Sequence, residues 1–324
     1  MNPEAVSSAA PSSGEPRPLS WAGLRSRAAL YLELTKPRIT FMVLVTAAAG
    51  FVLAHGALPA GGLPSAAGGA GSLPLALLFH ALAGTGLVAA SGSALNMVRE
   101  RDLDARMRRT ASRPLPAGKL DPDRALAFGV VLGVAGLLWL AQAVNLLTAV
   151  LGAATLAGYV FVYTPMKRVS SLATVVGAAP GAMPPVMGWA AYTGALGPGA
   201  WALFGILFFW QLPHFLAIAW MYRADYARAG FPMLPVVEPD GGSTARQAVL
   251  WSAALIPLSL LPAALGLAGP VYAVGAVALG LAYLAASVTF GRARTAQTAR
   301  RLLLVSVAYL PGILGTLLAD RLLG

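Results

Sequence analysis

Residues 96–119 read NMVRERDLDARMRRTASRPLPAGK and divide two apolar stretches, each long enough to cross a membrane. Within this segment, Asn96, Glu100 and Asp104 recur at every fourth position. On a helix they would spread over about 80° of one face, at about 100° per residue. Side-chain oxygens gathered in this way suit a hard cation such as Mg²⁺, which in turn binds diphosphate. We therefore expect a site at these three residues, called the polar row below.

A charged segment between membrane helices also has a second interpretation. Such loops commonly face water and keep a membrane protein oriented. Two observations favour a site. The polar row begins while the sequence is still apolar, and Glu100 and Asp104 would repel each other on one helix face unless a cation lies between them. Both carboxylates are then expected on a hydrated rim rather than in a packed core.

The composition predicts an all-helical polytopic membrane protein. Of the 324 residues, 57% are hydrophobic and only 11% are charged, and the mean hydropathy is +0.70. Several runs reach the roughly 20 apolar residues that span a bilayer. Nine spans are expected, at about 39–57, 75–98, 125–144, 146–163, 172–192, 200–221, 248–267, 271–290 and 302–319. The third and fourth are separated only around Asn145.

The basic residues predict the orientation in the membrane. Alternate connections, near 58–74, 145, 193–199 and 268–270, contain no Lys or Arg. The others hold nearly all of them, so the N-terminus is expected in the cytoplasm and the C-terminus outside it, with Arg321 as the exception. The net charge of +11 is then explained by topology and anionic lipid headgroups, and no nucleic-acid partner is expected.

The terminal segment and the cysteine count restrict the class further. Residues 1–24 are expected to form a disordered cytoplasmic tail, since the start of the chain is rich in Ser, Pro and Ala and lacks the apolar core of a signal peptide. Residues 25–324 then form a single membrane domain. Without a mitochondrial presequence, a prokaryotic inner membrane is expected. The absence of cysteine excludes disulfides and thiolate catalysis.

Two Gly-rich or Pro-rich stretches receive different interpretations. The segment 59–72, PAGGLPSAAGGAGS, is typical of a flexible external loop. The segment 177–189, GAAPGAMPPVMGW, lies inside an expected span, where its prolines remove helix hydrogen bonds. Irregular backbone at membrane depth is tolerated where it lines a cavity, and small residues would make room there for a bulky ligand.

Further polar residues are expected near the same membrane face. Tyr163, Lys167 and Arg168 follow the fourth span and are able to meet phosphate oxygens. His214 and Asp225 would lie on one face of a single helix, about 16 Å apart along its axis. An ionisable residue inside a membrane favours a ligand role for His214, against a hydrogen bond that ties two helices together. Structural roles are expected for His55 and His80.

The quoted segment resembles the first signature of the UbiA superfamily of membrane prenyltransferases, and its DLDxxMxRTxxRP form is similar to the protohaem IX farnesyltransferase branch. YTPMKRVSSLATVVGAAPGAMPPVMGW and PHFLAIAWMYRADYARAGFPMLPVV are similar to the same branch in order and spacing. The resemblance extends from about Thr35 to the last span.

The resemblance implies an all-helical bundle of nine spans around a central cavity. It also implies an Mg²⁺-dependent transfer of farnesyl from farnesyl diphosphate to a vinyl group of haem b, giving haem O, with a haem A synthase as a possible partner. It implies Asn96, Glu100 and Asp104 as ligands of Mg²⁺ and diphosphate, with Asp102 as a further catalytic carboxylate. The expected second metal-binding motif retains a single Asp, Asp225. The implied substrate-binding residues are Arg109, Arg113, Tyr163, Lys167, Arg168, His214, Arg223 and Tyr226.

Two alternatives stay open. The first is a prenyltransferase of the same superfamily that acts on an aromatic acid or a quinone precursor. The second is an ion-coupled transporter, a class that also uses broken helices and intramembrane polar groups. A transporter would more often place its coupling groups near the membrane midplane, whereas the polar row lies at one edge.

Overall fold

A computed structural model describes residues 21–57 and 73–323, and these are helical apart from the connections between helices, of which that at 105–121 is the longest. The expected loop at 59–72 and residues 1–20 of the expected tail at 1–24 lie outside the described residues. The last four residues of that tail, 21–24, are helical rather than disordered, since the first described helix begins at Trp21. The helices are α1 (Trp21–Leu34), α2 (Pro37–Ala57), α3 (Leu75–Asp104), α4 (Pro122–Ala143), α5 (Leu146–Ala157), η1 (Gly158–Tyr163), α6 (Thr164–Met166), α7 (Ala173–Thr193), α8 (Pro198–Met221), α9 (Arg223–Ala229), α10 (Leu234–Val237), α11 (Gly242–Ser259), α12 (Leu261–Ala264), α13 (Pro270–Ala293) and α14 (Ala296–Leu323).

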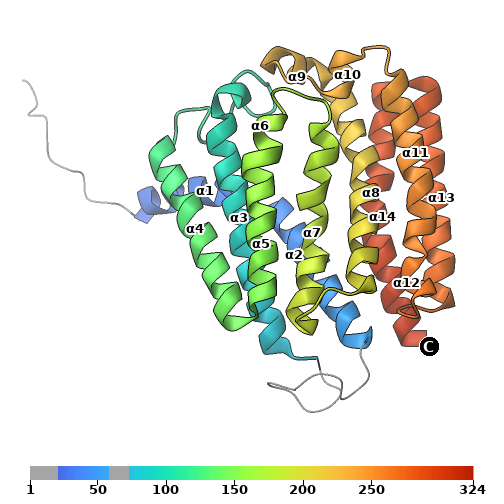
Figure 1. Ribbon diagram of the computed structural model, residues 1–324. Helices are drawn as coiled ribbons and strands as arrows, with labels where there is room; N and C mark the ends of the chain where they lie inside the picture. The colour runs from blue at the N-terminus through green and yellow to red at the C-terminus, as the bar shows by residue number, and fades with distance from the viewer. Residues whose placement is uncertain (1–20, 58–72, 324) are drawn as a thin grey trace, which may run out of the picture.

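The long helices run side by side as one bundle, with α9 and α10 at one end and α12 at the other (Figure 1). Within the described residues, 8 helical stretches are long and apolar enough to cross a membrane: α2, α3, α4, α5 through α6, α8, α11 through α12, α13 and α14. The one expected span not in this set is the fifth, at 172–192, which is α7; it has 21 residues and runs alongside the others. The expected all-helical membrane fold is confirmed.

The boundary between the third and fourth spans lies at Asn145, as expected. Its side chain accepts a hydrogen bond from the backbone N–H of Thr148 at 2.8 Å and so caps the start of α5. The same side chain donates to the carbonyl oxygen of Ala190 on α7 at 2.9 Å. One residue therefore ends one membrane helix, starts the next and joins both to a third.

The expectation of irregular backbone at 177–189 is wrong, because α7 is a continuous α-helix through Pro180, Pro184 and Pro185. Its small residues make room for another helix. A Cβ at Gly188 would overlap the carbonyl oxygen of Ala47 on α2, and a Cβ at Gly50 on α2 would overlap that of Pro185. Close backbone packing of α2 against α7 thus explains Gly188, whereas a Cβ at Gly177 would overlap the ring of Tyr163 and one at Gly181 would overlap the side chain of Gln211.

The last part of the fourth span contains a π-helical turn, η1, which is followed directly by the short helix α6. A π turn widens the helix by one residue and often marks a functional site. Here the hydroxyl of Thr164 donates to the carbonyl oxygen of Tyr159, five residues earlier, at 2.8 Å. The turn therefore sets the direction from which Thr164 and Lys167 approach α3.

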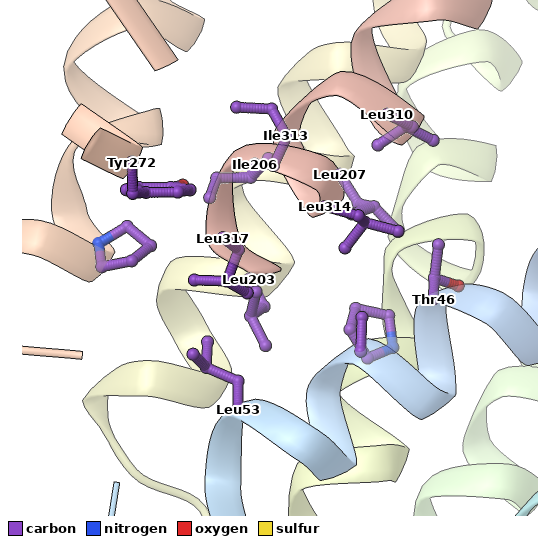
Figure 2. Close-up of a pocket in the computed structure, with 13 residues that line it drawn as sticks. Thr46, Leu53, Leu203, Ile206, Leu207, Tyr272, Leu310, Ile313, Leu314 and Leu317 are labelled. Atoms are coloured by element: carbon purple, nitrogen blue, oxygen red, sulfur yellow. The ribbon is translucent and has the colours of Figure 1, made fainter. Parts of the chain in front are cut away.

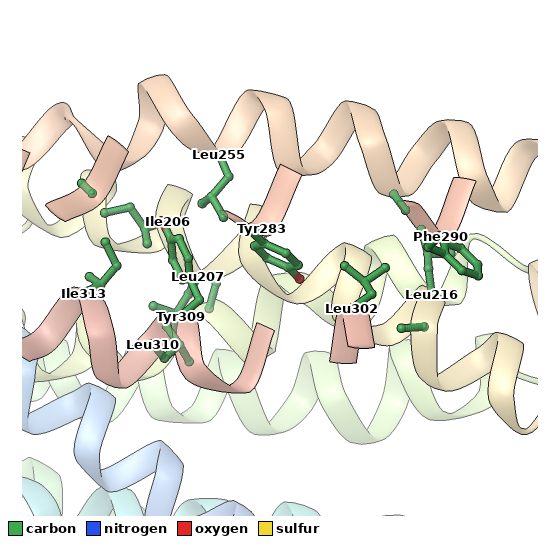
Figure 3. Packing of buried hydrophobic residues seen from close by; sticks show 14 of the residues in the cluster. Ile206, Leu207, Leu216, Leu255, Tyr283, Phe290, Leu302, Tyr309, Leu310 and Ile313 are labelled. Carbon is green, nitrogen blue, oxygen red and sulfur yellow. The ribbon is translucent and has the colours of Figure 1, made fainter. Parts of the chain in front are cut away.

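The largest apolar core joins α8, α11, α13 and α14. Figure 3 shows Tyr283 of α13 beside Tyr309 of α14, with Ile206 and Leu207 of α8 close to Tyr309 and Leu216 of α8 beside Phe290. The ring centroids of the two tyrosines are 5.7 Å apart. This half of the bundle is held together mainly by large buried side chains.

The helix that carries His214 ends earlier than the sequence suggested. α8 stops at Met221 because Tyr222 leaves the helical conformation, with φ −107° and ψ 19°, and Asp225 belongs to the short helix α9. The expected 16 Å separation along one helix axis is therefore wrong. The turn instead brings α9 back over the end of the bundle.

The connections at the α9 end pack on one another. Met107, which follows α3, is buried with Ala229, Phe231 and Met233, which lie in and after α9. These segments are far apart in the sequence, and their contact covers the end of α3. The polar row lies in the helical turns directly below this cover.

Candidate active site

The polar row occupies the last three turns of α3, and all three of its side chains are buried. Asn96 and Glu100 are 3% exposed and Asp104 is 1% exposed. The predicted helical spacing is confirmed, since α3 continues to Asp104. The expected hydrated rim is wrong, because the segments that follow α3 and α9 cover this end of the helix.

Each member of the polar row meets one cation of the protein itself. The Nζ atom of Lys167 lies 2.7 Å from Oε1 and 2.9 Å from Oε2 of Glu100. Arg113 donates to Oδ2 of Asp104 at 2.8 Å. Lys36 donates to Oδ1 of Asn96 at 3.2 Å. The repulsion between the two carboxylates is thus offset by side chains from three other segments.

Neutral hydrogen bonds hold the row in place. The amide nitrogen of Asn96 donates to the hydroxyl of Thr164 at 3.1 Å, and this hydroxyl is itself directed by the π turn. At the other end of the row, the hydroxyl of Thr110 donates to the backbone carbonyl oxygen of Asp104 at 2.8 Å. Thr110 and Thr164 were not among the residues expected at the site, because a threonine in an apolar helix or a polar loop carries little signal.

Lys167 lies between aromatic rings as well as beside Glu100. Its Nζ atom is 5.5 Å from the ring centroid of Tyr163 and 5.1 Å from that of Phe231, within the range of cation–π attraction. Burial alone would lower the pKa of Lys167, but Tyr163 and Glu100 outweigh burial and raise this pKa above its usual range. Lys167 therefore favours its protonated, cationic form beside Glu100.

Lys36 is a site residue that the sequence reasoning counted only as a topological charge. It lies in the turn between α1 and α2 with a φ of 47°, a left-handed conformation that is unusual for a residue before proline. Burial, and next the positive charge of Arg113, lower the pKa of Lys36 to about 8. The sequence did indicate a special position for Lys36. Only Arg38 separates it from the apolar run of α2 as a further charge, and Pro37 restricts its backbone.

Arg109 links the segment after α3 to that around α9. Its guanidinium lies 4.9 Å from the ring centroid of Tyr222 and 6.0 Å from that of Tyr226, and it donates to the hydroxyl of Tyr226 at 3.4 Å. Arg109 and Tyr226, two of the predicted substrate-binding residues, are thus in contact. Tyr222, which was not predicted, also contacts Arg109. These contacts are exposed, in contrast to those of the polar row.

Two further predicted phosphate ligands lie at the periphery. Arg168 donates to the carbonyl oxygen of Arg99, on the last part of α3. Arg223 donates to the carbonyl oxygen of Trp220 at 2.9 Å and packs over its ring at 4.6 Å. Both side chains are exposed and bonded to nearby carbonyl oxygens, so neither contacts the polar row directly.

Two predicted carboxylates stand apart from the polar row. The side chain of Asp102 is 77% exposed and lies 3.5 Å from that of Arg101, so its catalytic role stays a prediction. Asp225 pairs with Arg228 within α9. Among the described residues, no group of three or more His, Cys, Asp or Glu side chains is gathered to hold a metal, so Asp225 does not complete a ready-made cluster with Glu100 and Asp104.

His214 ties α8 to α14. Its Nδ1 atom lies 2.8 Å from the hydroxyl oxygen of Ser306, and its ring stacks on Trp210 at 5.2 Å. Trp210 in turn donates to the carbonyl oxygen of Ser306 at 2.7 Å. The helix-tying role weighed for His214 is thus present. His55 bonds to the hydroxyl of Tyr192 at 2.9 Å, which agrees with the structural role expected for it.

A small apolar cavity separates α2, α8 and α14 nearer to the α12 end. Figure 2 shows Thr46 and Leu53 of α2 facing Leu310, Leu314 and Leu317 of α14 across it. Its volume of about 30 Å³ holds no more than about two water molecules. Thr46 follows Lys36 by ten residues, so the cavity begins about 15 Å along α2 from the polar row.

The polar row suits Mg²⁺ by its chemistry. It offers two carboxylates and one amide oxygen, all of them buried, and Mg²⁺ is commonly held by one or two carboxylates together with phosphate oxygens of a substrate. Arg113 and Lys167, at 2.7–2.9 Å from the same carboxylates, are cations able to contact those phosphates. The residues thus fit a metal that arrives with a diphosphate.

Comparisons with known proteins identify the family of the chain. The sequence profile of the UbiA prenyltransferase family matches residues 43–309. A protein of Solibacter usitatus named protoheme IX farnesyltransferase is 52% identical over 294 residues, which cover 90% of this chain and 98% of that protein.

Solved structures share the fold. A digeranylgeranylglyceryl phosphate synthase superposes with a TM-score of 0.74 at 15% identity, over 91% of this chain and 98% of that one. A UbiA homologue from Archaeoglobus fulgidus, bound to GPP and Mg²⁺, superposes with a TM-score of 0.55 at 17% identity, over 89% of this chain and 99% of that one. The chain belongs to the UbiA prenyltransferase family.

Proposed function

We propose that this membrane prenyltransferase transfers the farnesyl group of farnesyl diphosphate to a vinyl group of haem b, giving haem O and diphosphate. One observation carries the donor half of this proposal. At the end of α3, buried carboxylates and phosphate-binding cations alternate within hydrogen-bond distance. The acceptor half is supported by the 52% identical relative named protoheme IX farnesyltransferase.

The metal-binding residues are Asn96, Glu100 and Asp104. Mg²⁺, when bound there, would neutralise negative charge that develops on the leaving diphosphate. The A. fulgidus homologue bound to GPP and Mg²⁺ supports this use of the metal. Asp225 would join the set only if α9 moved towards α3, since its carboxylate is now paired with Arg228.

Arg113 and Lys167 would hold the diphosphate oxygens as the allylic C–O bond ionises. A positive charge at 2.7–2.9 Å from the carboxylates already lies where the phosphate charge is expected to form. Arg168, Arg223 and the hydroxyls of Tyr163 and Tyr226 are proposed as outer contacts of the substrate. Arg109, stacked on Tyr222, would keep the covering segments together above them.

The reaction balances without a protein nucleophile. The C–O bond to diphosphate breaks, and a C–C bond forms between the farnesyl carbon and the vinyl group of haem. Water adds to the carbocation left on the former vinyl group, and its proton goes to solvent. The apolar side chains of α2, α8 and α14 would exclude other water from the farnesyl cation until this step.

His214 is proposed as the axial ligand of haem iron. Ser306 donates its hydroxyl proton to the carbonyl oxygen of Leu303 at 2.6 Å, so it accepts from Nδ1 of His214. This assignment leaves Nε2 unprotonated, which is the form that binds iron. A hydrogen bond to the second ring nitrogen also fixes the orientation of a metal-bound histidine. Tying two helices and binding haem are thus compatible roles.

The membrane placement is also a proposal. The absence of Lys and Arg from alternate connections supports a cytoplasmic N-terminus, an external C-terminus and an inner-membrane location. The α9 end of the bundle, with the polar row, would then face the cytoplasm. The haem O formed could pass to a haem A synthase in the same membrane.

The decisive experiment is the reaction itself in purified, detergent-solubilised protein. With haem b, farnesyl diphosphate and Mg²⁺, mass spectrometry should detect haem O, and Glu100→Gln should serve as the inactive control. A second reaction replaces haem b by 4-hydroxybenzoate, which should remain unprenylated. Prenylation of 4-hydroxybenzoate without haem O formation would establish the quinone-precursor alternative instead.

A separate measurement tests His214. In His214→Ala, titration with haem b followed at the Soret band should show a loss of haem affinity of about tenfold or more, with unchanged affinity for farnesyl diphosphate. Ser306→Ala is the matched variant, because it removes the helix tie and keeps the imidazole. If both variants lose only thermal stability and keep the haem spectrum, the ligand role is wrong.

A further inference from the structure

The three members of the polar row are each bonded to a different cation, and these cations come from three separate segments. Lys36 lies between α1 and α2, Arg113 lies between α3 and α4, and Lys167 follows α6. Their partners are Asn96, Asp104 and Glu100 respectively. Every turn of the row thus carries one cation–acceptor pair, in which the cation bonds Oδ1 of Asn96, both carboxylate oxygens of Glu100 or Oδ2 of Asp104. A metal that binds these oxygens must therefore compete with the cations.

The net charge of the polar row and its three cations disfavours the binding of a metal ion alone or of a diphosphate alone. Three cations and two carboxylates sum to +1, since +3 and −2 combine. A divalent metal alone would raise the local charge to +3 and would compete with ammonium and guanidinium groups for the same oxygens. A diphosphate, with about three negative charges, would have to draw those cations away from buried carboxylates. Metal and diphosphate together bring the sum to about zero.

The three side chains have room to change partners. The side chains of Arg113 and Lys167 are 26% and 14% exposed, whereas those of Asp104 and Glu100 are 2% and 4% exposed. The acceptors are thus the fixed part of each pair and the cations the movable part. Lys36 holds a neutral amide at the longest of the three distances, 3.2 Å, so its contact is the weakest.

We propose that the polar row is loaded by exchange of counter-ions, in which Mg²⁺ takes over the oxygens of the row while Lys36, Arg113 and Lys167 turn to the diphosphate. Lys36 is the third diphosphate-binding cation of the site. The proposal rests on the proposed function of the row as the donor-substrate site. It requires the metal and the diphosphate to strengthen each other's binding. The diphosphate draws the three cations away from the oxygens that the metal needs, and the metal replaces the cations as partners of those oxygens.

The coupling is measurable without any prenyl acceptor. Mn²⁺, which prefers the same oxygen ligands as Mg²⁺, loses its free-ion electron paramagnetic resonance signal on binding. In the wild-type protein, inorganic pyrophosphate should increase the Mn²⁺ affinity by about 5- to 150-fold, the usual range for coupled sites. Mn²⁺ should increase the pyrophosphate affinity by the same factor, because linkage is reciprocal.

Lys36→Met separates this proposal from simpler ones by opposite changes in the two affinities. Removal of the amine frees Oδ1 of Asn96, so Mn²⁺ alone should bind at least about threefold more tightly, whereas pyrophosphate with saturating Mn²⁺ should bind about tenfold more weakly. Lys36→Gly should behave alike and guards against misfolding, since glycine adopts a positive φ without strain. Lys119→Met, at an exposed lysine after α3, is the matched control and should change neither affinity.

Two results would overturn the proposal. Equal Mn²⁺ affinity with and without pyrophosphate in the wild type would mean that the metal site is preformed. A loss of both affinities in Lys36→Met and Lys36→Gly would mean that Lys36 only supports the fold. The two proposals are tested separately. Coupled binding of Mn²⁺ and pyrophosphate without haem O formation would reject haem b as the acceptor but leave the exchange of counter-ions intact. Haem O formation without coupled binding would reject the exchange but leave the proposed reaction intact.

Discussion

Two acidic regions lie at the α9 end of the bundle, and they differ in burial and in the origin of their cationic partners. Glu100 and Asp104 end a 30-residue helix, are buried, and pair with cations from distant segments. Asp225 lies on a 7-residue helix and pairs with Arg228, three positions later on that helix. The first region is held by tertiary contacts of α3, α6 and the loop after α3. The second is held mainly by its own turn.

This difference indicates a division of roles. A buried charge with a buried partner is costly to separate, so the polar row keeps its geometry before any ligand binds. A local ion pair on a short helix is worth little, so α9 is free to change its contacts. We infer that the row provides the fixed half of the donor site, and that α9 provides the half that adjusts to the substrate.

The largest effect is expected from neutralising the row. Glu100→Gln and Asp104→Asn should each lower turnover by about 100-fold or more, because each removes a charge from the metal site. Each should also lower the melting temperature by several degrees, since Lys167 or Arg113 loses its buried partner. Turnover at saturating and limiting Mg²⁺, with a melting curve, checks both. Near-normal turnover at limiting Mg²⁺ would reduce the row to a topological segment.

A smaller effect is expected where the charge is kept and its geometry is changed. Arg113→Lys should raise the KM for farnesyl diphosphate by about tenfold, because an ammonium group cannot reproduce the two-pronged contact of a guanidinium with phosphate. Steady-state kinetics at saturating haem b measure this value. Lys167→Arg provides the reciprocal exchange. An unchanged KM in both variants would remove these residues from the diphosphate site.

Variants of Asp225 test the difference between the buried polar row and the local ion pair of α9. If its pair with Arg228 is only local, Asp225→Asn should lower turnover by no more than about fivefold, and Arg228→Ala should change stability by less than about 1 kcal/mol. Turnover and chemical denaturation of the two variants give the comparison. A loss for Asp225→Asn as large as that for Glu100→Gln would show that α9 supplies an essential metal ligand, and the contrast would be broken.

The smallest effect is expected at Asp102. This carboxylate is next to the row in sequence but exposed and paired with Arg101. Asp102→Asn should keep turnover within about twofold of the wild type, since an exposed ion pair contributes little. Because it removes one negative charge from the same segment, it is the matched control for Glu100→Gln. A large loss would mean that the end of α3 rotates when substrate binds.

Much of the fold followed from local rules. Runs of about 20 apolar residues predicted the long helices, and the four-residue spacing of the polar row predicted its common face. Two errors have physical causes. Prolines in α7 suggested a broken helix, but packing against α2 keeps it continuous. The apolar run of α8 suggested a helix through Asp225, but the backbone turns at Tyr222.

The sequence alone determined the helices, their membrane character and the three acceptors of the polar row, because each depends on residues a few positions apart. Tertiary structure decided which cation each acceptor meets. Lys36 is 60 residues from Asn96, and Lys167 is 67 residues from Glu100. No local periodicity records such a pairing. It arises when α2, α3 and the end of the fourth span pack together and exclude water, which makes a buried carboxylate without a cation too costly to keep.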